Sequence, residues 1–182
     1  MNAFYNDSDE HCCAWLKELI AARLISRGTV DERSISAIVP GNLMGYQRAH
    51  FFAGIGGWEE ALRIAGWPEG REVWTGSCPC QPYSTAGKGK GDGDPRNLWP
   101  ELFRLIRECR PATIFGEQVA SAIGYGWADR VRADLEREGY AFGMAVLGAH
   151  SAGAPHIRQR MFWVAYREGG RREQVDSLRS GS

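Results

Sequence analysis

The sequence of 182 residues lacks the marks of several protein classes. No uninterrupted apolar stretch approaches the roughly 20 residues that cross a bilayer, and the segment Met1–Asp9 is polar and acidic, unlike a secretion signal. The five cysteines are odd in number, and Cys12 with Cys13, and Cys78 with Cys80, lie too close together for a secreted disulfide framework. The 22 Lys and Arg balance the 22 Asp and Glu, so bulk charge does not draw the chain to nucleic acid. We therefore expect a soluble, cytoplasmic protein with reduced thiols.

The residues that are present predict a folded domain. With 43% hydrophobic residues and seven tryptophans, the chain can bury enough apolar surface to offset the entropy of ordering. Its length fits one domain rather than two. Apolar spacing predicts an amphipathic helix over 11–26, which ends before Gly28, followed by an irregular connector over 29–45.

From residue 49 onward, short apolar segments alternate with amphipathic ones. We expect strands at 49–53, 72–76, 112–115, 140–147 and 161–166, and helices at 58–65, from 100 onward, and ending at 139. This alternation predicts an α/β fold with a mostly parallel sheet and helices on its faces. We divide the chain into an N-terminal helix and connector (1–47), a catalytic domain (48–166) and a disordered tail (167–182).

The first candidate site is a glycine-rich turn between a strand and a helix, Phe52-Ala53-Gly54-Ile55-Gly56-Gly57-Trp58. Glycines there let a ligand approach the backbone, and ligands of such sheets bind beyond the carboxyl ends of the strands. The nicotinamide fingerprint needs a third glycine where Glu59 stands, so that cofactor is disfavoured. An ordinary tight turn is the alternative interpretation.

The second candidate site is a proline-rich loop at a strand end, Gly76-Ser77-Cys78-Pro79-Cys80-Gln81-Pro82-Tyr83-Ser84. Its prolines could hold an exposed thiol at the sheet edge, and nearby positive charge from Arg158 or Arg160 would favour the thiolate. Two cysteines without further ligands at a recognisable spacing do not predict a metal site. A buried, inert thiol is the alternative.

Two further sites lie later in the chain. Glu117 ends a strand at the same edge of the sheet, where its carboxyl group could hydrogen-bond or protonate a substrate ring; an acid at a helix start is the alternative. Arg158 and Arg160 are two residues apart, a spacing that sends both to one face of an extended segment. Two solvated surface charges are the alternative there.

Taken together and in this order, these segments resemble the DNA cytosine-5 methyltransferases, most closely the short bacteriophage and prophage versions. The glycine segment is similar to the family's first motif, Pro79-Cys80-Gln81-Pro82-Tyr83-Ser84 to its catalytic loop, Glu117-Gln118-Val119 to its Glu-Asn-Val motif, and His156-Ile157-Arg158-Gln159-Arg160 to its Gln-x-Arg-x-Arg motif. The resemblance covers about residues 49–165. It implies a Rossmann-like, S-adenosylmethionine-dependent methyltransferase fold.

The resemblance also implies roles for individual residues. Cys80 would be the nucleophile that adds to a flipped cytosine, Glu117 would hold ring N3, and Arg158 and Arg160 would lie beside the base and the catalytic loop. The cofactor S-adenosylmethionine would contact Phe52, Ala53, Gly54, Gly56, Gly57 and Trp58. Double-stranded DNA would contact the segment 84–96 through Ser84, Lys88, Lys90 and Arg96.

Three departures from the family change these expectations. His50, His156 and Gln118 stand where the family has Asp, Gln and Asn. Gly54 and Cys80 are too close in sequence to contain the two strands that the family places between them, so we expect a sheet shortened in its cofactor half. The acids that hold the cofactor's ribose and adenine would lie on those strands, and the local substitutes are Glu59, Glu60 and Glu72. Gly41-Asn42 is a candidate remnant of the family's last motif, displaced to the N-terminal segment.

Three functions remain open on the sequence. The first is transfer of a methyl group from S-adenosylmethionine to C5 of cytosine in DNA. The second is a catalytically incomplete binding or assembly subunit that works with a separate target-recognition subunit or as a homodimer. The third is C5 modification of a free cytosine nucleotide.

Overall fold

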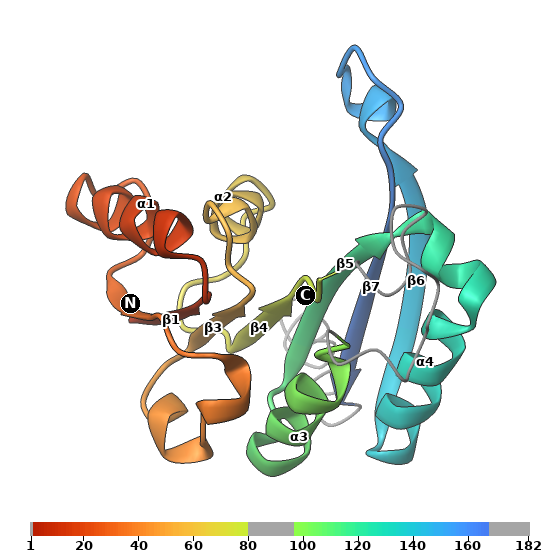
Figure 1. The fold of residues 1–182 in the computed structure, drawn as a ribbon, viewed down its shortest axis with the longest axis horizontal. Coiled ribbons are helices and arrows are strands. Elements are labelled where there is room, and N and C mark those ends of the chain that lie inside the picture. Colours follow the sequence, from red (N-terminus) through yellow and green to blue (C-terminus); the bar gives the residue numbers. More distant parts are fainter. Residues whose placement is uncertain (1, 80–96, 168–182) are drawn as a thin grey trace, which may run out of the picture.

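The computed structural model describes residues 2–79 and 97–167. Within these residues seven strands form one sheet in the order β2-β1-β3-β4-β5-β7-β6 (Figure 1). The strands are β1 (Ala3–Asn6), β2 (Gly28–Asp31), β3 (Arg48–Phe51), β4 (Val73–Gly76), β5 (Thr113–Val119), β6 (Tyr140–Gly148) and β7 (Gln159–Arg167). Strands β1 to β5 run parallel to one another, and β7 is antiparallel to both β5 and β6. This confirms the predicted α/β fold with a mostly parallel, Rossmann-like sheet.

The expectation of a sheet short of two strands is wrong. The N-terminal segment supplies them: β1 pairs with β3, and β2 pairs with the outer side of β1. Only the segment of chain between β3 and β4 is therefore short. The connector predicted over 29–45 contains most of β2. Gly41 and Asn42 lie in a short 3-10 helix. The division of the chain at residue 47 stays a prediction, but the sheet runs across it.

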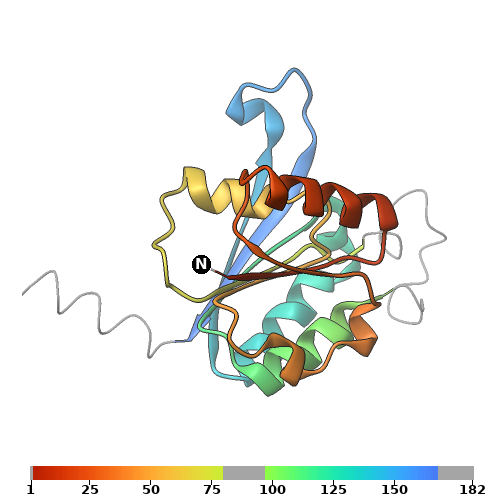
Figure 2. The same cartoon turned by 90° about the vertical axis from the view of Figure 1, so that its left-hand side faces the viewer.

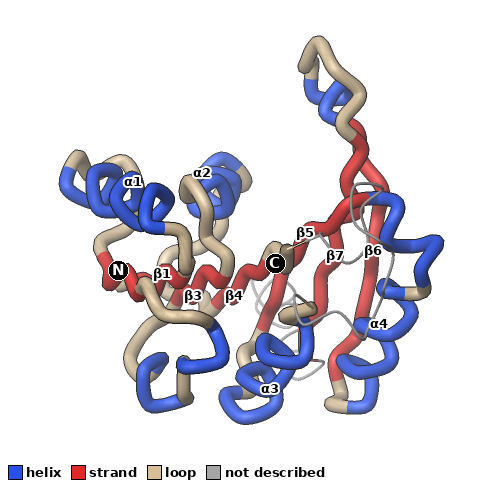
Figure 3. Tube along the Cα trace, viewed as in Figure 1, coloured by secondary structure: helices blue, strands red, loops and turns tan. Residues whose placement is uncertain are grey.

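Helices cover both faces of the sheet (Figure 2). Helices α1 (Glu10–Ala21) and α2 (Gly57–Ile64) lie on one face. Helices α3 (Trp99–Cys109) and α4 (Trp127–Arg137) lie on the other, with the 3-10 turns η1 (Ile35–Ala37) and η2 (Pro40–Leu43). Figure 3 shows the alternation of helix and strand that produces these layers.

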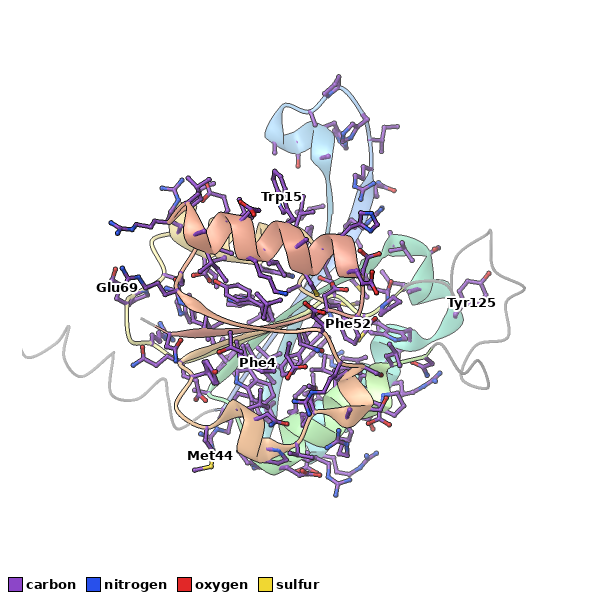
Figure 4. All side chains as sticks on the ribbon, turned by 60° about the vertical axis from the view of Figure 1, so that its left-hand side comes forward. Phe4, Trp15, Met44, Phe52, Glu69 and Tyr125 are labelled. Carbon is purple, nitrogen blue, oxygen red and sulfur yellow. The ribbon has the colours of Figure 1, made fainter. Side chains whose placement is uncertain are left out.

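Each layer has its own apolar core. On the α1 side a small cluster contains Ala3, Tyr5, Leu16 and Ala53. On the other side a larger cluster is built around Trp99, whose ring meets the rings of Trp127 and Trp163 edge-on. Figure 4 shows Phe4 directed into this second layer and Trp15 directed outward from α1. Strands β1 and β3 are buried on both faces, so their residues do not alternate between polar and apolar.

Helix α1 is shorter than the sequence predicts. It begins at Glu10 because the carboxylate of Asp9 accepts hydrogen bonds from the backbone N–H groups of His11 and Cys12. It ends at Ala21 rather than before Gly28, because Arg23 adopts a left-handed backbone conformation with φ of 61°. No helix in the described ranges is long and apolar enough to cross a bilayer.

Several predicted features lie outside the described residues. These are the segment 80–96, with the proposed nucleophile and the proposed DNA contacts, and the tail from residue 168. The other predicted strands and helices are present, with β5 extending to Val119 and α2 ending one residue before the predicted end at 65.

Candidate active site

The glycine-rich turn connects β3 to α2 at the carboxyl edge of the sheet. Its backbone needs glycine: Gly54 and Gly56 have φ of 54° and 80°, and Phe52 adopts φ of 52°. A Cβ atom at Gly54 or Gly57 would meet no atom of residues 2–79 and 97–167 within 4 Å, so these residues leave the turn open on that side. Ala53 is buried, and Phe52 is half-buried beside the turn (Figure 4). Such an open turn at a strand end suits a ligand-binding role.

Trp58, at the start of α2, contacts the sheet rather than the turn. Its indole N–H donates to Ser77 Oγ at 2.9 Å, just after β4. Its ring stacks on Phe115 of β5 and meets Phe162 of β7 edge-on. Trp58 thus fixes the turn to the strand that leads into the cysteine loop.

Asp7 is a site residue that the sequence did not reveal. It follows β1, and its carboxylate accepts a hydrogen bond of 2.8 Å from the backbone N–H of Gly54. Because β1 and β3 are adjacent parallel strands, their carboxyl ends meet at one edge of the sheet. An acid from the start of the chain therefore lies against the glycine turn.

Asp31 is the second acid at this edge. It ends β2, and the guanidinium and backbone N–H of Arg33 hydrogen-bond its carboxylate. These bonds outweigh burial and lower the pKa of Asp31, so it stays ionised at neutral pH. The buried amide of Asn6 donates to the carbonyls of Asp31 and Arg33 and ties the end of β2 to the end of β1.

The acids expected to replace those of the two missing strands have other contacts. Glu59 is buried and paired with Arg48 at 2.7 Å and with His50 at 2.9 Å. Glu60 pairs with Arg63 on the surface of α2. The carboxylate of Glu72 accepts a hydrogen bond from the N–H of Ala112, which precedes β5. Glu59, Glu60 and Glu72 stay candidates for holding the cofactor, and the carboxyl edge adds Asp7 and Asp31 as two further candidates.

Glu117 lies within β5 and not at a helix start. Arg160, opposite Val119 on β7, places its Nε 2.7 Å from a carboxylate oxygen of Glu117. Both side chains are about one-quarter exposed, at 26% and 24%. Burial raises the pKa of Glu117 from its usual range, and the positive charges of Arg160 and Arg158 only partly offset this. The carboxyl group therefore stays protonated to a higher pH than an exposed glutamate.

Only one of the two arginines lies in a strand, so the prediction that both belong to one extended segment is wrong. Arg158 precedes β7 and has φ of 32°, which breaks the extended conformation before Arg160. Arg160 bonds Glu117, whereas Arg158 is exposed and acts on Glu117 through its charge.

The cysteine loop starts beside Glu117. Gln118, which is 1% exposed, donates from Nε2 to the carbonyl of Cys78 at 3.3 Å, and its Oε1 accepts from the N–H of Val119. The chain that leads toward Cys80 is thereby fastened to β5. Cys78 itself is buried, and burial raises the pKa of its thiol to about 12, so it stays protonated.

The other described cysteines are also unsuited to nucleophilic catalysis. Cys12, Cys13, Cys78 and Cys109 are free thiols, and burial raises the pKa of each. Cys80 lies outside the described residues, so its role stays a prediction. Ser84, Lys88, Lys90 and Arg96 lie outside them as well.

Comparison with known proteins assigns the chain to a protein family. Residues 67–179 match the model of the C-5 cytosine-specific DNA methylases. The chain is 31% identical over 100 residues to the type II methyltransferase M.NgoMIV of Neisseria gonorrhoeae, covering 53% of this chain and 32% of that protein. It is 33% identical over 93 residues to M.HhaI of Haemophilus parahaemolyticus, covering 49% and 28%. The chain thus spans about a third of the length of these curated relatives.

Solved structures share the fold. The Dnmt2 methyltransferase of S. pombe aligns with a TM-score of 0.56 and 15% identity, over 92% of this chain and 51% of its own. A structure from an E. coli prophage aligns with a TM-score of 0.57 and 15% identity, over 93% and 47%. The family match covers more than half of the sequence, including both Cys78 and Glu117. The chain belongs to the C-5 cytosine-specific DNA methylase family.

Proposed function

We propose that the chain carries the catalytic part of an S-adenosylmethionine-dependent DNA methyltransferase that modifies C5 of cytosine. The placement of Glu117 carries this proposal. Its half-buried carboxyl group is held by Arg160 at the carboxyl edge of the sheet, beside the strand end that leads to Cys80. A thiol and a carboxylic acid that reach the same pyrimidine are what this reaction needs.

The chemistry follows from the weak nucleophilicity of C5 in cytosine. The thiolate of Cys80 adds to C6, while Glu117 supports N3 and accepts the change in charge there. C5 would then take the methyl group from the sulfonium, whose S–CH3 bond breaks to leave S-adenosylhomocysteine. Loss of the C5 proton to solvent would expel the Cys80 thiolate from C6, and N3 would return its proton to Glu117. Because a stacked base is out of reach, the cytosine must first be flipped out, at a cost of a few kcal/mol. The raised pKa of Glu117 suits it to donate a proton to N3.

The residues at the carboxyl edge fit S-adenosylmethionine, which would supply the methyl group on its sulfonium. The open turn at Gly54 and Gly57 leaves room for the methionine end. Two acids stand at the ends of β1 and β2, Asp7 and Asp31, and ionised carboxylates accept hydrogen bonds from ribose hydroxyls and the adenine amino group. Phe52 would contact the adenine. In this chain the strands that bear these acids precede the glycine turn, whereas the family places them after it.

The partner would be double-stranded DNA, and Ser84, Lys88, Lys90 and Arg96 are the proposed contacts to its phosphates. A separate target-recognition subunit, or a second copy of the chain, is the proposed source of sequence recognition. Arg158 and Arg160 would hold the flipped base and the catalytic loop in place.

Transfer of labelled methyl groups tests this function. The chain is incubated with S-adenosylmethionine and either unmethylated plasmid DNA or deoxycytidine nucleotides. We expect label in DNA and none in nucleotides, and a loss of about 100-fold or more in Glu117→Gln, the scale of general acid catalysis. Glu108→Gln removes an exposed acid on α3 and should leave the rate unchanged.

The other outcomes identify the alternatives. Label in free nucleotides alone would favour modification of nucleotides. Cofactor binding without transfer to either substrate, and transfer restored by a partner protein, would favour an incomplete subunit.

A further inference from the structure

The connection between β6 and β7 is an arm that projects from the body of the molecule (Figures 1 and 2). We define the arm as residues 148–158. Strand β5 ends at Val119, opposite Arg160 of β7, which itself pairs with Leu147 of β6. Beyond this point Gly148 still pairs with Gln159, no third strand of the described residues joins them, and the arm extends past the carboxyl end of β5.

The arm is held in shape by its own hydrogen bonds. The N–H of Ala149 donates to the carbonyl of Ile157 at 2.9 Å, and the N–H of Ala154 donates to the carbonyl of Ala149 at 3.2 Å. Ser151 Oγ donates to the carbonyl of Gly148 at 2.7 Å. The backbone of Ile157 is therefore fixed, while its side chain is 66% exposed.

The side chains of the arm are suited to a polyanion. Its ionisable residues are His150, His156 and Arg158, and it contains no Asp or Glu. Ile157 stands between His156 and Arg158, so the exposed apolar side chain is flanked by an imidazole and a guanidinium, both of which can donate hydrogen bonds to nucleic acid. A surface that carries a cation and no acid suits a polyanion.

The arm also begins at the candidate active site. Ile157 is three residues before Arg160, which bonds Glu117. Arg158 is close enough for its charge to act on Glu117.

We propose that this arm contacts duplex DNA beside the target cytosine, with Ile157 inserted between stacked bases and His156 on an adjacent phosphate, while Arg158 stays beside the flipped base. Aliphatic side chains act as wedges in other DNA-binding proteins, where they unstack a base step. Here the wedge would reduce the cost of extracting the cytosine. The inference rests on the proposed action on DNA.

The test compares Ile157→Ala with Ile64→Ala, which removes a similarly exposed isoleucine (72%) from the end of α2. Binding is measured by fluorescence anisotropy with a labelled mixed-sequence plasmid fragment, and methyl transfer is measured on plasmid DNA in duplex and heat-denatured form. We expect Ile157→Ala to weaken duplex binding and duplex methylation at least tenfold. On single strands, which need no unstacking, we expect less than a twofold change. Ile64→Ala should match wild type throughout.

The inference would be overturned if Ile157→Ala reduced methylation of duplex and single-stranded DNA equally, or if this variant bound and methylated duplex DNA as wild type does. It would also be overturned if the wild-type protein did not bind duplex DNA. If Ile157→Ala kept the DNA affinity of wild type but lost the binding of a purified partner protein, the inference would also be overturned, in favour of a protein partner. The two proposals can fail separately. If the wild-type protein binds duplex DNA but transfers no methyl groups, and Ile157→Ala loses duplex affinity while Ile64→Ala does not, the arm inference stands and the proposed function fails.

Discussion

At the scale of single residues, a buried ion-pair cluster supports the glycine turn. Glu59 on α2 reaches Arg48 and His50 on β3, all three side chains being 6% exposed or less. His50 Nδ1 is also 2.9 Å from Thr75 Oγ1 on β4, and its ring stacks on Tyr5 of β1. The cluster therefore connects the first turn of α2 to three strands. It links the helix that follows the proposed cofactor turn to the sheet.

Glu59 should make the stability of the protein depend on pH. Burial opposes its charge, but hydrogen bonds and ion pairs with His50, Ser26 and Arg48 prevail and lower its pKa from 4.5 to about 2. A lowered pKa of an acid adds stability that is fully present above the unfolded value and is lost as pH falls toward the folded value. This contribution should disappear between about pH 4.5 and pH 2, at up to about 1.4 kcal/mol per pH unit.

We predict that Glu59→Gln lowers the free energy of unfolding by about 3–5 kcal/mol at neutral pH, because it leaves Arg48 and His50 buried without their partner. Denaturant titration at several pH values should show the difference from wild type shrinking below pH 4.5. The control is Glu60→Gln, which breaks the surface pair with Arg63 and should cost about 1 kcal/mol or less. Equal losses in the two variants would refute the role of the cluster.

Gly116 on β5 is a second residue that tolerates no larger side chain without a rearrangement of the core. A Cβ atom there would lie 2.1 Å from the ring of Trp163, a buried side chain of the larger core. We predict that Gly116→Ala destabilises the protein by about 1–3 kcal/mol, through displacement of this ring. Gly143→Ala on β6 is the matched control, since its Cβ would meet Val164 at an ordinary 3.8 Å. Thermal unfolding of both variants tests the difference, and a Gly116→Ala protein as stable as Gly143→Ala would contradict it.

At the scale of elements, motifs within a short stretch of chain were predictable, and contacts across the sheet were not. The glycine turn, the strand that holds Glu117 and the helices α2, α3 and α4 follow from local spacing. Strand β1 gave no such signal, because Ala3–Asn6 is short and buried on both faces. Asp7 and Asp31 become site residues only once the strand order is known. The different roles of Arg158 and Arg160 depend on a backbone turn that spacing does not encode.

The two N-terminal strands make a prediction about the cofactor. We expect Asp31→Asn to reduce the affinity for S-adenosylmethionine at least tenfold in calorimetry, because the amide is a poorer acceptor for the cofactor's hydrogen-bond donors. The matched control is Glu32→Gln, which removes the next acid along, a partner of Lys17 on α1. Circular dichroism of both variants should match wild type. Wild-type affinity in Asp31→Asn would exclude this acid from the cofactor site.

At the scale of the whole molecule, the described residues form one seven-stranded sheet in which the two N-terminal strands lie at one side, next to β3. The order β2-β1-β3-β4-β5-β7-β6 brings the first acid, Asp7, to the glycine turn and brings Glu117 to the cysteine loop. Both halves of the candidate site therefore open at one edge of one sheet. The sequence motifs predicted the fold class, which is confirmed, and named the glycine turn and Glu117 as candidate site residues. The three-dimensional pairing was needed to add Asp7 and Asp31 to these candidates.

The central claim is that Cys80 attacks a cytosine held by Glu117, and a covalent trap tests it most directly. The protein is incubated with S-adenosylmethionine and DNA that contains 5-fluorocytosine, which cannot lose its C5 substituent, and the products are separated under denaturing conditions. We predict a stable protein–DNA adduct for wild type and for Cys78→Ser, whose thiol is buried and protonated, and none for Cys80→Ser. An adduct that persists in Cys80→Ser, or a wild-type protein that forms none, would contradict the account.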